Sequence, residues 1–485
     1  MSKCKKVGYF SGSIILVIVL IVLIAPYFLG LAAQKSIKKV VANLPKQDGI
    51  SVQIKSYDRD WFTSKALIQV ALDPNASPQA VWQYQIQNKG QLPPKFYLNI
   101  TTNIWHGPFI FAKDLQNKWH FSVGRALAIG QIQIPNAERQ LMLAKYNINT
   151  ANNQESLFIS LMGDMNLDLQ LPNLTIAKVD GSRDFALSGL TLNYTVSPDV
   201  KSQVGNMHVK QITFKNQDNV IQVNDIKHQF DLKRDMSHLW TGKANLSVDE
   251  IKLSNGKQII FDQKSVDLSS DASIKDKLLS LKMLATTGAL VFEDKEFSSG
   301  SFQFQLSNFG AKAVNQLRIL NEQLQSQKVG TTQYVQGFYH LAPSLFGYGA
   351  QIHLAPCELN TPYGKLSFGL NATFPNIQKD KITDNKVLFK NVESMNQLVI
   401  PQKLLSIILT KYYQNRLQAA MQYTDTAAPK EMTPEAMDKL VASKVEATIS
   451  NWQQQNYLIS KDGNFVINVN YKQGQLDVNG QAIVQ

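Results

Sequence analysis

Apolar and polar residues alternate along much of the chain, and this pattern dominates between residues 50 and about 310. In the runs 165–171, 190–196 and 302–306, every apolar residue is followed by a polar one. A period of two places the apolar side chains of a strand on one face and the polar ones on the other, which is typical of an antiparallel sheet with one wet side. Residues 46–310 are therefore predicted to form a large antiparallel region with one apolar face.

Turn signals separate the predicted strands. Examples are Asp180-Gly181-Ser182 and Asn255-Gly256, sequences that favour tight turns. A doubly wound nucleotide-binding fold would instead alternate strands with helices, so the pattern argues against that class. The sequence leaves open whether the sheet closes as a sandwich or keeps an apolar groove.

Helical spacing recurs in the second half of the chain. Residues 311–329 are predicted to form one helical insert within the region 311–400, where strand alternation resumes at 351–374. A helix pair is predicted over 401–456. Its second member begins at Thr433-Pro434, because threonine caps a helix and proline fits its first turn.

The chain ends in a predicted β-hairpin over 457–485, with Lys472-Gln473-Gly474 as its turn. Taken together, the patterns predict a mainly β (α+β) fold, with one helical insert and a late helix pair.

An uncharged apolar run of 20 residues extends from Ile14 to Ala33. A helix of that length crosses a hydrocarbon core of about 30 Å, so 14–33 is predicted to be a transmembrane helix after a basic leader, residues 1–13. A cleaved signal peptide is the alternative, with Gly30-Leu31-Ala32 as a weak cleavage site. The apolar part of a signal peptide is shorter, about 7 to 15 residues.

Lysines flank this run on both sides, so their distribution leaves its orientation nearly balanced: Lys3, Lys5 and Lys6 precede it, and Lys35, Lys38 and Lys39 follow it. Long domains translocate largely regardless of their charge. We therefore expect a single-pass protein of the inner (cytoplasmic) membrane, with its N-terminus in the cytoplasm and its bulk in the periplasm.

Residues 34–45 are predicted to form a juxtamembrane amphipathic helix. Ile37, Val40, Val41 and Leu44 recur at helical spacing, and Pro45 ends the pattern. Such a helix would continue the anchor or lie among lipid headgroups, with Lys35, Lys38 and Lys39 at the membrane surface. Alternatively, it packs on its own domain.

The charge balance argues against a nucleic-acid partner. Of the net charge of +12, seven lysines before residue 48 account for 7, so only +5 remains over the other 438 residues. A nucleic-acid site needs basic side chains gathered along a groove or helix. Here the excess flanks the apolar run, and lipid headgroups are the expected partner.

No catalytic, metal or cofactor site is predicted. The seven histidines show no metal-ligand spacing, and Gly-x-Ser-x-Gly and phosphate-binding loops are missing from the sequence. The two cysteines, Cys4 and Cys357, would lie on opposite sides of the membrane, so no disulfide is expected.

Two short stretches combine charged and aromatic residues in an unusual density. The first, 57–62, contains Tyr57, Arg59, Trp61 and Phe62, and the second, 106–109, is His106-Gly107-Pro108-Phe109. They are candidates for a ligand or interaction surface, with Arg59 paired with Asp58 or Asp60. The alternative is structural, with aromatic residues at a sheet edge and Gly107-Pro108 in a turn.

These stretches resemble the YdgA-like proteins of the bacterial envelope, a family of unknown function. Its pattern combines an N-terminal membrane helix, a Tyr-x-Arg-x-x-Phe segment and a His-Gly-Pro-Phe motif. Asp60 stands where many members have glycine, so a glycine-dependent turn is not implied here. The resemblance implies location and architecture, and it supplies no activity.

Three classes of function remain. The first is a non-enzymatic structural or interaction protein that binds envelope partners, and the second is a carrier of lipid or another hydrophobic ligand along an apolar groove. The third is a hydrolase with a site near His106. A one-sided sheet must cover its apolar face with helices, another layer or a ligand, so the alternating strands favour the first two.

Overall fold

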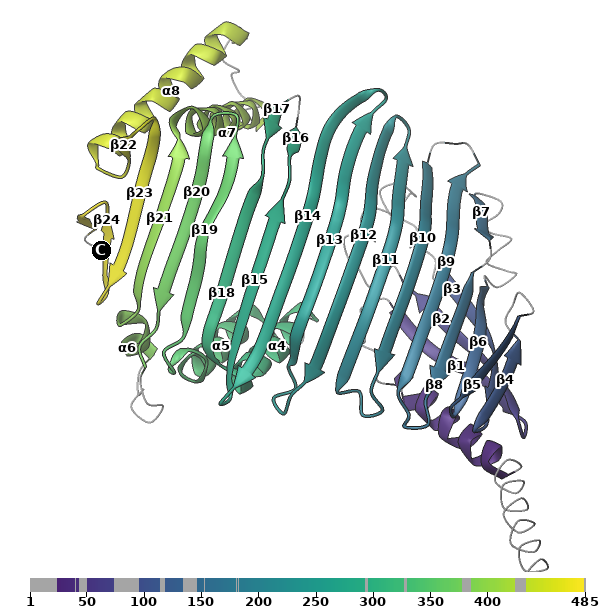
Figure 1. Cartoon of the computed structure of the whole chain (residues 1–485). Coiled ribbons are helices and arrows are strands. Elements are labelled where there is room, and N and C mark those ends of the chain that lie inside the picture. The colour runs from purple at the N-terminus through teal and green to yellow at the C-terminus, as the bar shows by residue number, and fades with distance from the viewer. Residues whose placement is uncertain are drawn as a thin grey trace, which may run out of the picture. The chain divides into compact units, whose positions relative to one another are not determined.

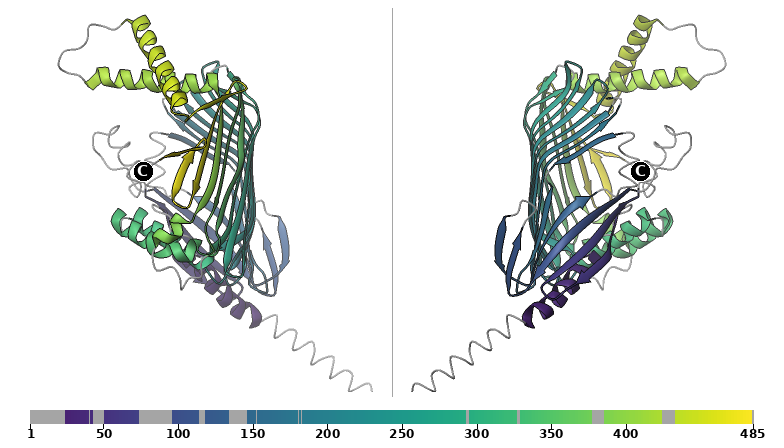
Figure 2. Two further views of the ribbon diagram at one scale, coloured as in Figure 1. Left: turned by 90° about the vertical axis from the view of Figure 1, so that its left-hand side faces the viewer. Right: turned by 90° about the vertical axis from the view of Figure 1, so that its right-hand side faces the viewer.

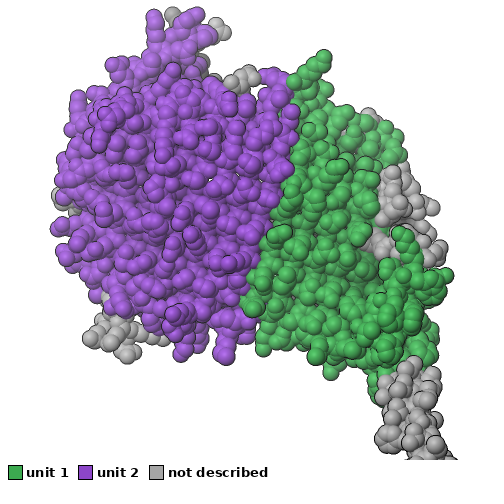
Figure 3. All heavy atoms as spheres, in the orientation of Figure 1, with its two compact units in different colours: residues 1–233, 253–257 green, residues 234–252, 258–485 purple. Residues whose placement is uncertain are grey.

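A computed structural model describes residues 24–39, 41–42, 50–73, 96–113, 118–133, 146–151, 153–179, 181, 183–292, 295–326, 329–376, 385–423 and 433–483. The predicted leader and the first ten residues of the predicted transmembrane run lie outside these ranges. The chain divides into two compact units (Figure 3): unit 1 contains residues 1–233 and 253–257, and unit 2 contains 234–252 and 258–485. Both are mainly β, as the alternation predicted.

The sheet of unit 1 is antiparallel and meanders from its first strands to the long strands that follow (Figure 1). Its strands pair in the order β1 (Ile50–Arg59), β2 (Thr63–Leu72), β3 (Phe96–His106), β6 (Ala126–Gln133), β8 (Gln154–Ile159), β9 (Met165–Lys178), β10 (Arg183–Val196), β11 (Ser202–Asn216) and β12 (Asn219–Arg234). A further strand, β7 (Tyr146–Ala151), pairs with the second half of β9.

Strand register places the alternating residues opposite one another. Leu167 lies opposite Tyr194, and Leu169 lies opposite Leu192. A slip of one residue would move the whole apolar set to the other face. The period of two that is visible in the sequence therefore fixes both the strands and their register.

An N-terminal helix packs on the sheet of unit 1. Residues 24–39 are helical, and the buried positions Pro26, Gly30, Ala33 and Ile37 recur at intervals of four, three and four, which is one helix face. Within the described residues, no helix is long and apolar enough to cross a membrane.

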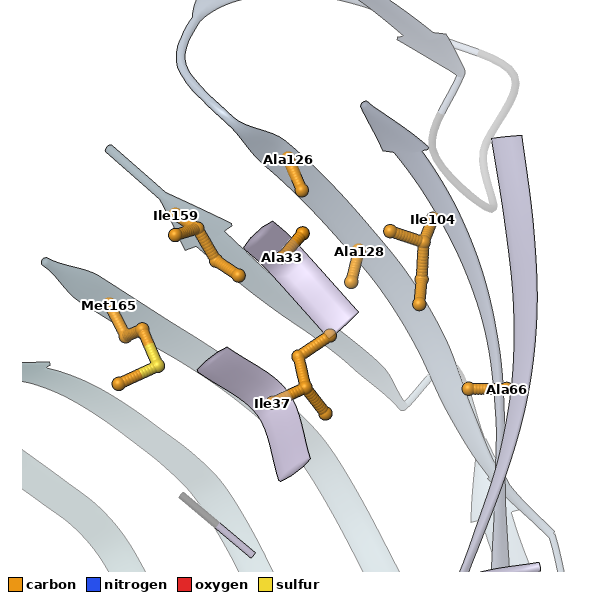
Figure 4. Packing of buried hydrophobic residues seen from close by; sticks show 8 residues of the cluster. All are labelled: Ala33, Ile37, Ala66, Ile104, Ala126, Ala128, Ile159 and Met165. Atoms are coloured by element: carbon orange, nitrogen blue, oxygen red, sulfur yellow. The ribbon is translucent and has the colours of Figure 1, made fainter. Parts of the chain in front are cut away.

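The contact between this helix and the sheet is a core of small and branched side chains (Figure 4). Ala33 is 0% exposed and Ile37 is 4% exposed. They pack against residues of β2, β3, β6, β8 and β9: Ala66, Ile104, Ala126, Ala128, Ile159 and Met165. Residues 34–45 were expected either to lie at the membrane or to pack on their own domain, and Ile37 packs on its own domain. Val40 and Leu44 lie outside the described residues.

A separate two-stranded sheet covers one side of unit 1. It consists of β4 (Phe109–Lys113) and β5 (Trp119–Val123). Ile110 and Ala112 of β4 are buried against Leu127 and Ile129 of β6.

Unit 2 is also built on antiparallel strands, and β13 (Trp240–Asn255) precedes its main strands in the chain. They pair in the order β14 (Gln258–Lys275), β15 (Leu278–Thr287), β18 (Gly300–Gly310), β19 (Gln351–Thr361), β20 (Gly364–Thr373), β21 (Glu393–Pro401), β23 (Asn464–Lys472), β24 (Gln475–Val478) and β25 (Gln481–Ile483). Three short strands complete it: β16 (Leu290–Phe292), β17 (Lys295–Phe297) and β22 (Ile459–Lys461).

Helices cover two ends of one face of this sheet (Figures 1 and 2). At one end lie α4 (Ala311–Gln325), α5 (Thr331–Phe346) and the short α6 (Asn385–Lys390), and at the other lie α7 (Gln402–Tyr423) and α8 (Pro434–Gln454). As predicted, Thr433 caps α8 by accepting a hydrogen bond from the amide of Ala436. Pro401 ends β21, and α7 begins one residue later than expected.

The prediction of a single insert helix over 311–329 is wrong, because a second helix, α5, follows α4 in the chain. Gly337 and Pro343 interrupt the helical signal of α5, since both residues disfavour helix interiors. The helix forms because its apolar face is buried: Ala342 is 0% exposed and Leu345 is 3% exposed in the core with Phe309 of β18.

Candidate functional site

The two motif stretches meet at one end of three neighbouring strands. The segment 57–62 ends β1 and leads to β2, whereas His106 ends β3. Because β2 pairs with both strands, Arg59 lies opposite Ser64, and Thr63 lies opposite Trp105. The topology therefore brings together residues that are about fifty positions apart in the chain.

His106 is the centre of this cluster. Its side chain is 3% exposed, its Nδ1 lies 2.9 Å from the carbonyl oxygen of Pro26, and its Nε2 lies 3.1 Å from the Ser64 hydroxyl. Burial lowers the pKa of His106, against opposing backbone contacts at Thr63 and Pro26, so the neutral ring is favoured. A carbonyl oxygen only accepts hydrogen bonds; therefore Nδ1 carries the proton and Nε2 accepts from Ser64.

Two glycines allow the N-terminal helix to lie directly on this histidine. A Cβ atom on Gly30 would stand 2.7 Å from the His106 ring. Gly107 has φ +146° and faces the ring of Pro26, 3.3 Å from where its own Cβ would be, a conformation that L side chains rarely adopt. The glycine of the His-Gly-Pro-Phe motif thus allows the backbone to adopt this conformation next to the Pro26 ring.

Arg59 contacts the helix and does not form the ion pair expected from the sequence. Its guanidinium lies 4.5 Å from the centre of the Tyr27 ring, and Nη1 lies 3.5 Å from the Tyr27 carbonyl oxygen. Trp61 packs on the same ring at 5.2 Å. Among the described residues, Arg59 has no ion pair with Asp58 or Asp60. The cation–π contact takes the place of that pair.

The remaining predicted residues divide between the interior and the surface. Tyr57 packs against the core beneath the helix, and burial raises the pKa of its phenol. Trp61, Phe62 and Phe109 are 50%, 49% and 54% exposed. Pro108 begins the turn into β4, and its carbonyl accepts from the amide of Gly124.

The three lysines of the helix, Lys35, Lys38 and Lys39, are exposed on its outer side. Lys39 also donates a hydrogen bond of 2.8 Å to the carbonyl oxygen of Pro198, so one of them is tied to unit 1 itself.

The contacts of this cluster hold the N-terminal helix against the sheet of unit 1. Ser64 and His106 have the contact of a nucleophile and its base, but Ser64 is 2% exposed and His106 is 3% exposed beneath the helix. The ring lies directly against Gly30 of the helix, so the pair is buried in this arrangement. Within the described part of the chain, no group of three potential metal ligands occurs.

A second candidate surface lies on unit 2. Its residues form no sequence motif, but they are among the alternating apolar positions of the predicted strands. We define the open strip as seven apolar residues on one face of β15, β18, β19, β20 and β21: Met283, Phe302, Phe304, Leu354, Phe368, Leu370 and Leu398. Register places Met283, Phe304 and Leu354 in one row across three strands, and Phe368 opposite Leu398.

Both helix groups border the open strip without covering it. On one side, Leu306 and Ile352 pack under α4 and α5, and on the other side Leu366 and Ile467 pack under α7 and α8. Between them, Met283, Phe302 and Phe368 remain 39%, 41% and 37% exposed.

The open strip contains an apolar depression of about 310 Å³. Residues from five strands line it, among them Ala285, Phe302, Cys357, Phe368 and Leu398. Five neighbouring strands about 4.8 Å apart make the strip roughly 19 Å long, a length comparable with that of an acyl chain.

Fold and sites together define a class: a large antiparallel-sheet protein whose N-terminal helix is locked onto its first strands, with an open apolar surface on the second unit. The chain belongs to a family of bacterial proteins of unknown function, DUF945, whose sequence profile matches residues 5–484. No curated protein matches the chain. No solved structure matches it either.

Proposed function

We propose that this chain is a membrane-anchored, non-enzymatic protein of the bacterial envelope that binds a hydrophobic, acyl-chain-containing ligand on the open strip of unit 2. The observation that carries the proposal is the apolar face left between the two helix groups, where Phe302 is 41% exposed and Phe368 is 37% exposed. Helices cover the same face at both ends, so a ligand would complete the layer that a one-sided sheet requires.

The energetics favour an aliphatic ligand. Each buried methylene contributes about 0.8 kcal/mol, and the depression exposes almost only apolar atoms. Polar anchoring groups are few, with Thr287, Ser301 and Glu358 at one side of the depression. Such a surface distinguishes ligands by length and apolar character rather than by their headgroup.

The anchorage is supported by the sequence before the helix. The uncharged run extends from Val7 to Gln34, a length of 28 residues. A bilayer core of about 30 Å requires about 20 of them, which leaves the later residues free to pack on unit 1 as Gly30 and Ala33 do. We propose a cytoplasmic N-terminus, a single pass through the inner membrane and a periplasmic body.

Within the DUF945 family, we place the chain with the YdgA-like envelope proteins. The proposal rests on Tyr57, Arg59 and Phe62 and on the motif 106–109, which follow the apolar run in the expected order. The structure supports a shared architectural role for these motifs, because Arg59 and His106 both contact the N-terminal helix.

The enclosure of Ser64 and His106 supports the assignment to a non-enzymatic class. A hydrolase site near His106 would need an accessible nucleophile. Binding of other envelope proteins through the sheets stays a prediction, whereas the open strip supports the ligand-binding alternative directly.

Native mass spectrometry of the purified full chain tests this proposal. We expect lipid to remain bound to the wild-type protein and to a Leu284→Asp control, because residue 284 lies on the opposite face from Met283. The variant Phe302→Asp should lose the bound lipid while remaining folded. Equal amounts of lipid on the two variants, or none on the wild type, would contradict the proposal.

A further inference from the structure

The hairpin of β4 and β5 has one face with buried apolar residues and one exposed aromatic face. Ile110 and Ala112 are 2% and 0% exposed against unit 1. The alternate positions point to solvent at 49–69% exposure: Phe109, Phe111, Trp119, Phe121 and Val123. Large apolar residues gathered in this way on a surface mark an interaction site.

Contacts between these side chains make them one continuous patch. Phe121 stacks on Phe109 at 6.5 Å and packs on Phe111 at 4.9 Å. Next to them, the ammonium group of Lys113 lies 4.7 Å from the centre of the Trp119 ring. The register explains this packing, since Phe111 lies opposite Phe121 and Lys113 lies opposite Trp119. The aromatic patch is therefore formed by paired strand positions and does not need a partner to assemble.

The aromatic patch begins next to the first described turn of the N-terminal helix. Phe109 is the third residue after His106, which binds the carbonyl of Pro26, and Gly107 lies against the Pro26 ring. Hairpin and helix lie at the same end of unit 1 in both views (Figures 1 and 2). In and beside the same described turn, Phe28 is 61% exposed and Trp61, which packs on Tyr27, is 50% exposed.

The composition of the hairpin fits a lipid interface. Tryptophan and other aromatic residues concentrate at the level of the headgroups, where lysine side chains extend toward phosphates. Over residues 109–123, Lys113 and Lys118 stand against Asp114 as the only acidic residue, which gives a net charge of +1. The uncharged sequence directly precedes Ile24 in the chain, and Pro26 contacts His106 and Gly107, which lead into the aromatic patch; we therefore expect a bilayer entered by that sequence to face the patch.

We propose that the exposed face of β4 and β5 inserts into the headgroup–acyl boundary of the bilayer that the N-terminal segment enters. The proposal rests on the anchorage proposed above. It gives the His-Gly-Pro-Phe motif two linked roles: His106 and Gly107 hold the helix, and Phe109 begins the surface that contacts lipid. Unit 1 would then be fixed against the membrane at two points.

A fluorescent label on the full chain tests this contact. Phe121→Cys is labelled with nitrobenzoxadiazole in a background of Cys4→Ser and Cys357→Ala, and the protein is reconstituted in vesicles of phosphatidylethanolamine and phosphatidylglycerol. Val179→Cys is the matched control. It is also exposed (60%), but it directly follows the last residue of β9, 14 residues from Met165 and roughly 45 Å away from the core under the helix.

The label at residue 121 should gain fluorescence several-fold and be quenched by nitroxides on the lipid acyl chains, while the label at residue 179 should do neither. A label at residue 121 that remains water-exposed in protein that floats with the vesicles would overturn the proposal, and so would shielding without quenching, which indicates a protein partner. Protein that does not float with the vesicles would overturn the anchorage itself, and this inference with it.

Discussion

The imidazole Nδ1 of His106 donates a hydrogen bond to the carbonyl oxygen of Pro26 across 80 positions of sequence. The bond joins the end of β3 to the first described turn of the N-terminal helix. Because Nε2 accepts from Ser64 on β2, one side chain fixes the helix to two strands. This arrangement makes the motif histidine a structural link between the N-terminal segment and unit 1.

Replacement of this histidine is expected to release the helix. His106→Ala leaves the Ser64 hydroxyl without its partner and opens a cavity, at a cost of about 2–4 kcal/mol. Trypsin should then cut at Lys35 and Lys38 faster than in the wild type, at a lower melting temperature. His340→Ala, on an exposed position of α5, is the control. Ligand binding per folded molecule should be unchanged, and trypsin resistance equal to the wild type would contradict the role.

The close contact between Gly30 and His106 predicts a non-additive pair. Gly30→Ala should destabilise the docked helix in the wild type, because the new methyl group would meet the ring at 2.7 Å. In a His106→Ala background the same change should be neutral or stabilising, since alanine favours a helix by about 1 kcal/mol over glycine. Proteolysis rates of the four proteins measure the coupling. Additive effects would show that the ring does not set the helix position.

Glu155 predicts a pH dependence in unit 1. Burial raises its pKa from 4.5 to about 7, and its Oε1 atom has no hydrogen-bond partner in the described part of the chain. A folded-state pKa above the unfolded one means that the folded state favours the proton. The stability contributed by the protonated acid is therefore complete below about pH 4.5 and is lost as the pH rises to about 7.

Glu155→Gln should remove this dependence. At pH 8 the variant should be more stable than the wild type by up to about 3 kcal/mol, with little difference at pH 4. Hydrogen exchange of the β8 and β9 amides reports the local stability at each pH. The exposed Glu296 provides a control as Glu296→Gln. If the stability of the wild type and of Glu155→Gln changes with pH in the same way, Glu155 is not the cause of the pH dependence.

Cys357 provides a native probe of the open strip. It lines the apolar depression, and burial raises the pKa of its thiol. Alkylation by N-ethylmaleimide should therefore slow when lipid occupies the strip and accelerate after delipidation. A cysteine introduced as Leu284→Cys, on the opposite face, should react at the same rate in both states. If the alkylation rate of Cys357 is the same with and without lipid, the ligand does not bind on the open strip.

The strand pattern was predictable because alternation is a local property that survives in the folded sheet. Thr433-Pro434 was likewise sufficient to predict the start of α8. The partner of Arg59 was not predictable, because Tyr27 lies 32 positions away and no sequence rule relates them. The same holds for Gly30 and Ala33: in the sequence they belong to an uncharged apolar run, and only the fold brings them against His106 and β6.

The open strip and the aromatic patch show a different limit of prediction from sequence. Their residues are visible in the sequence as alternating apolar positions, as in Phe109, Phe111 and Trp119, Phe121. Alternation tells which residues share a face, but it does not tell which faces other elements cover. That depends on where α4, α5, α7 and α8 pack, and hence on long-range contacts.

The most direct test of ligand binding on unit 2 is photo-crosslinking of the full chain in bacterial cells, with p-benzoylphenylalanine at residue 283 or at residue 284. Met283 and Leu284 are 39% and 38% exposed, but they lie on opposite faces of β15 because successive strand residues alternate. Lipid should crosslink to residue 283 and not to residue 284. Equal lipid adducts at both positions, or adducts at 284 alone, would contradict a ligand site on the open strip.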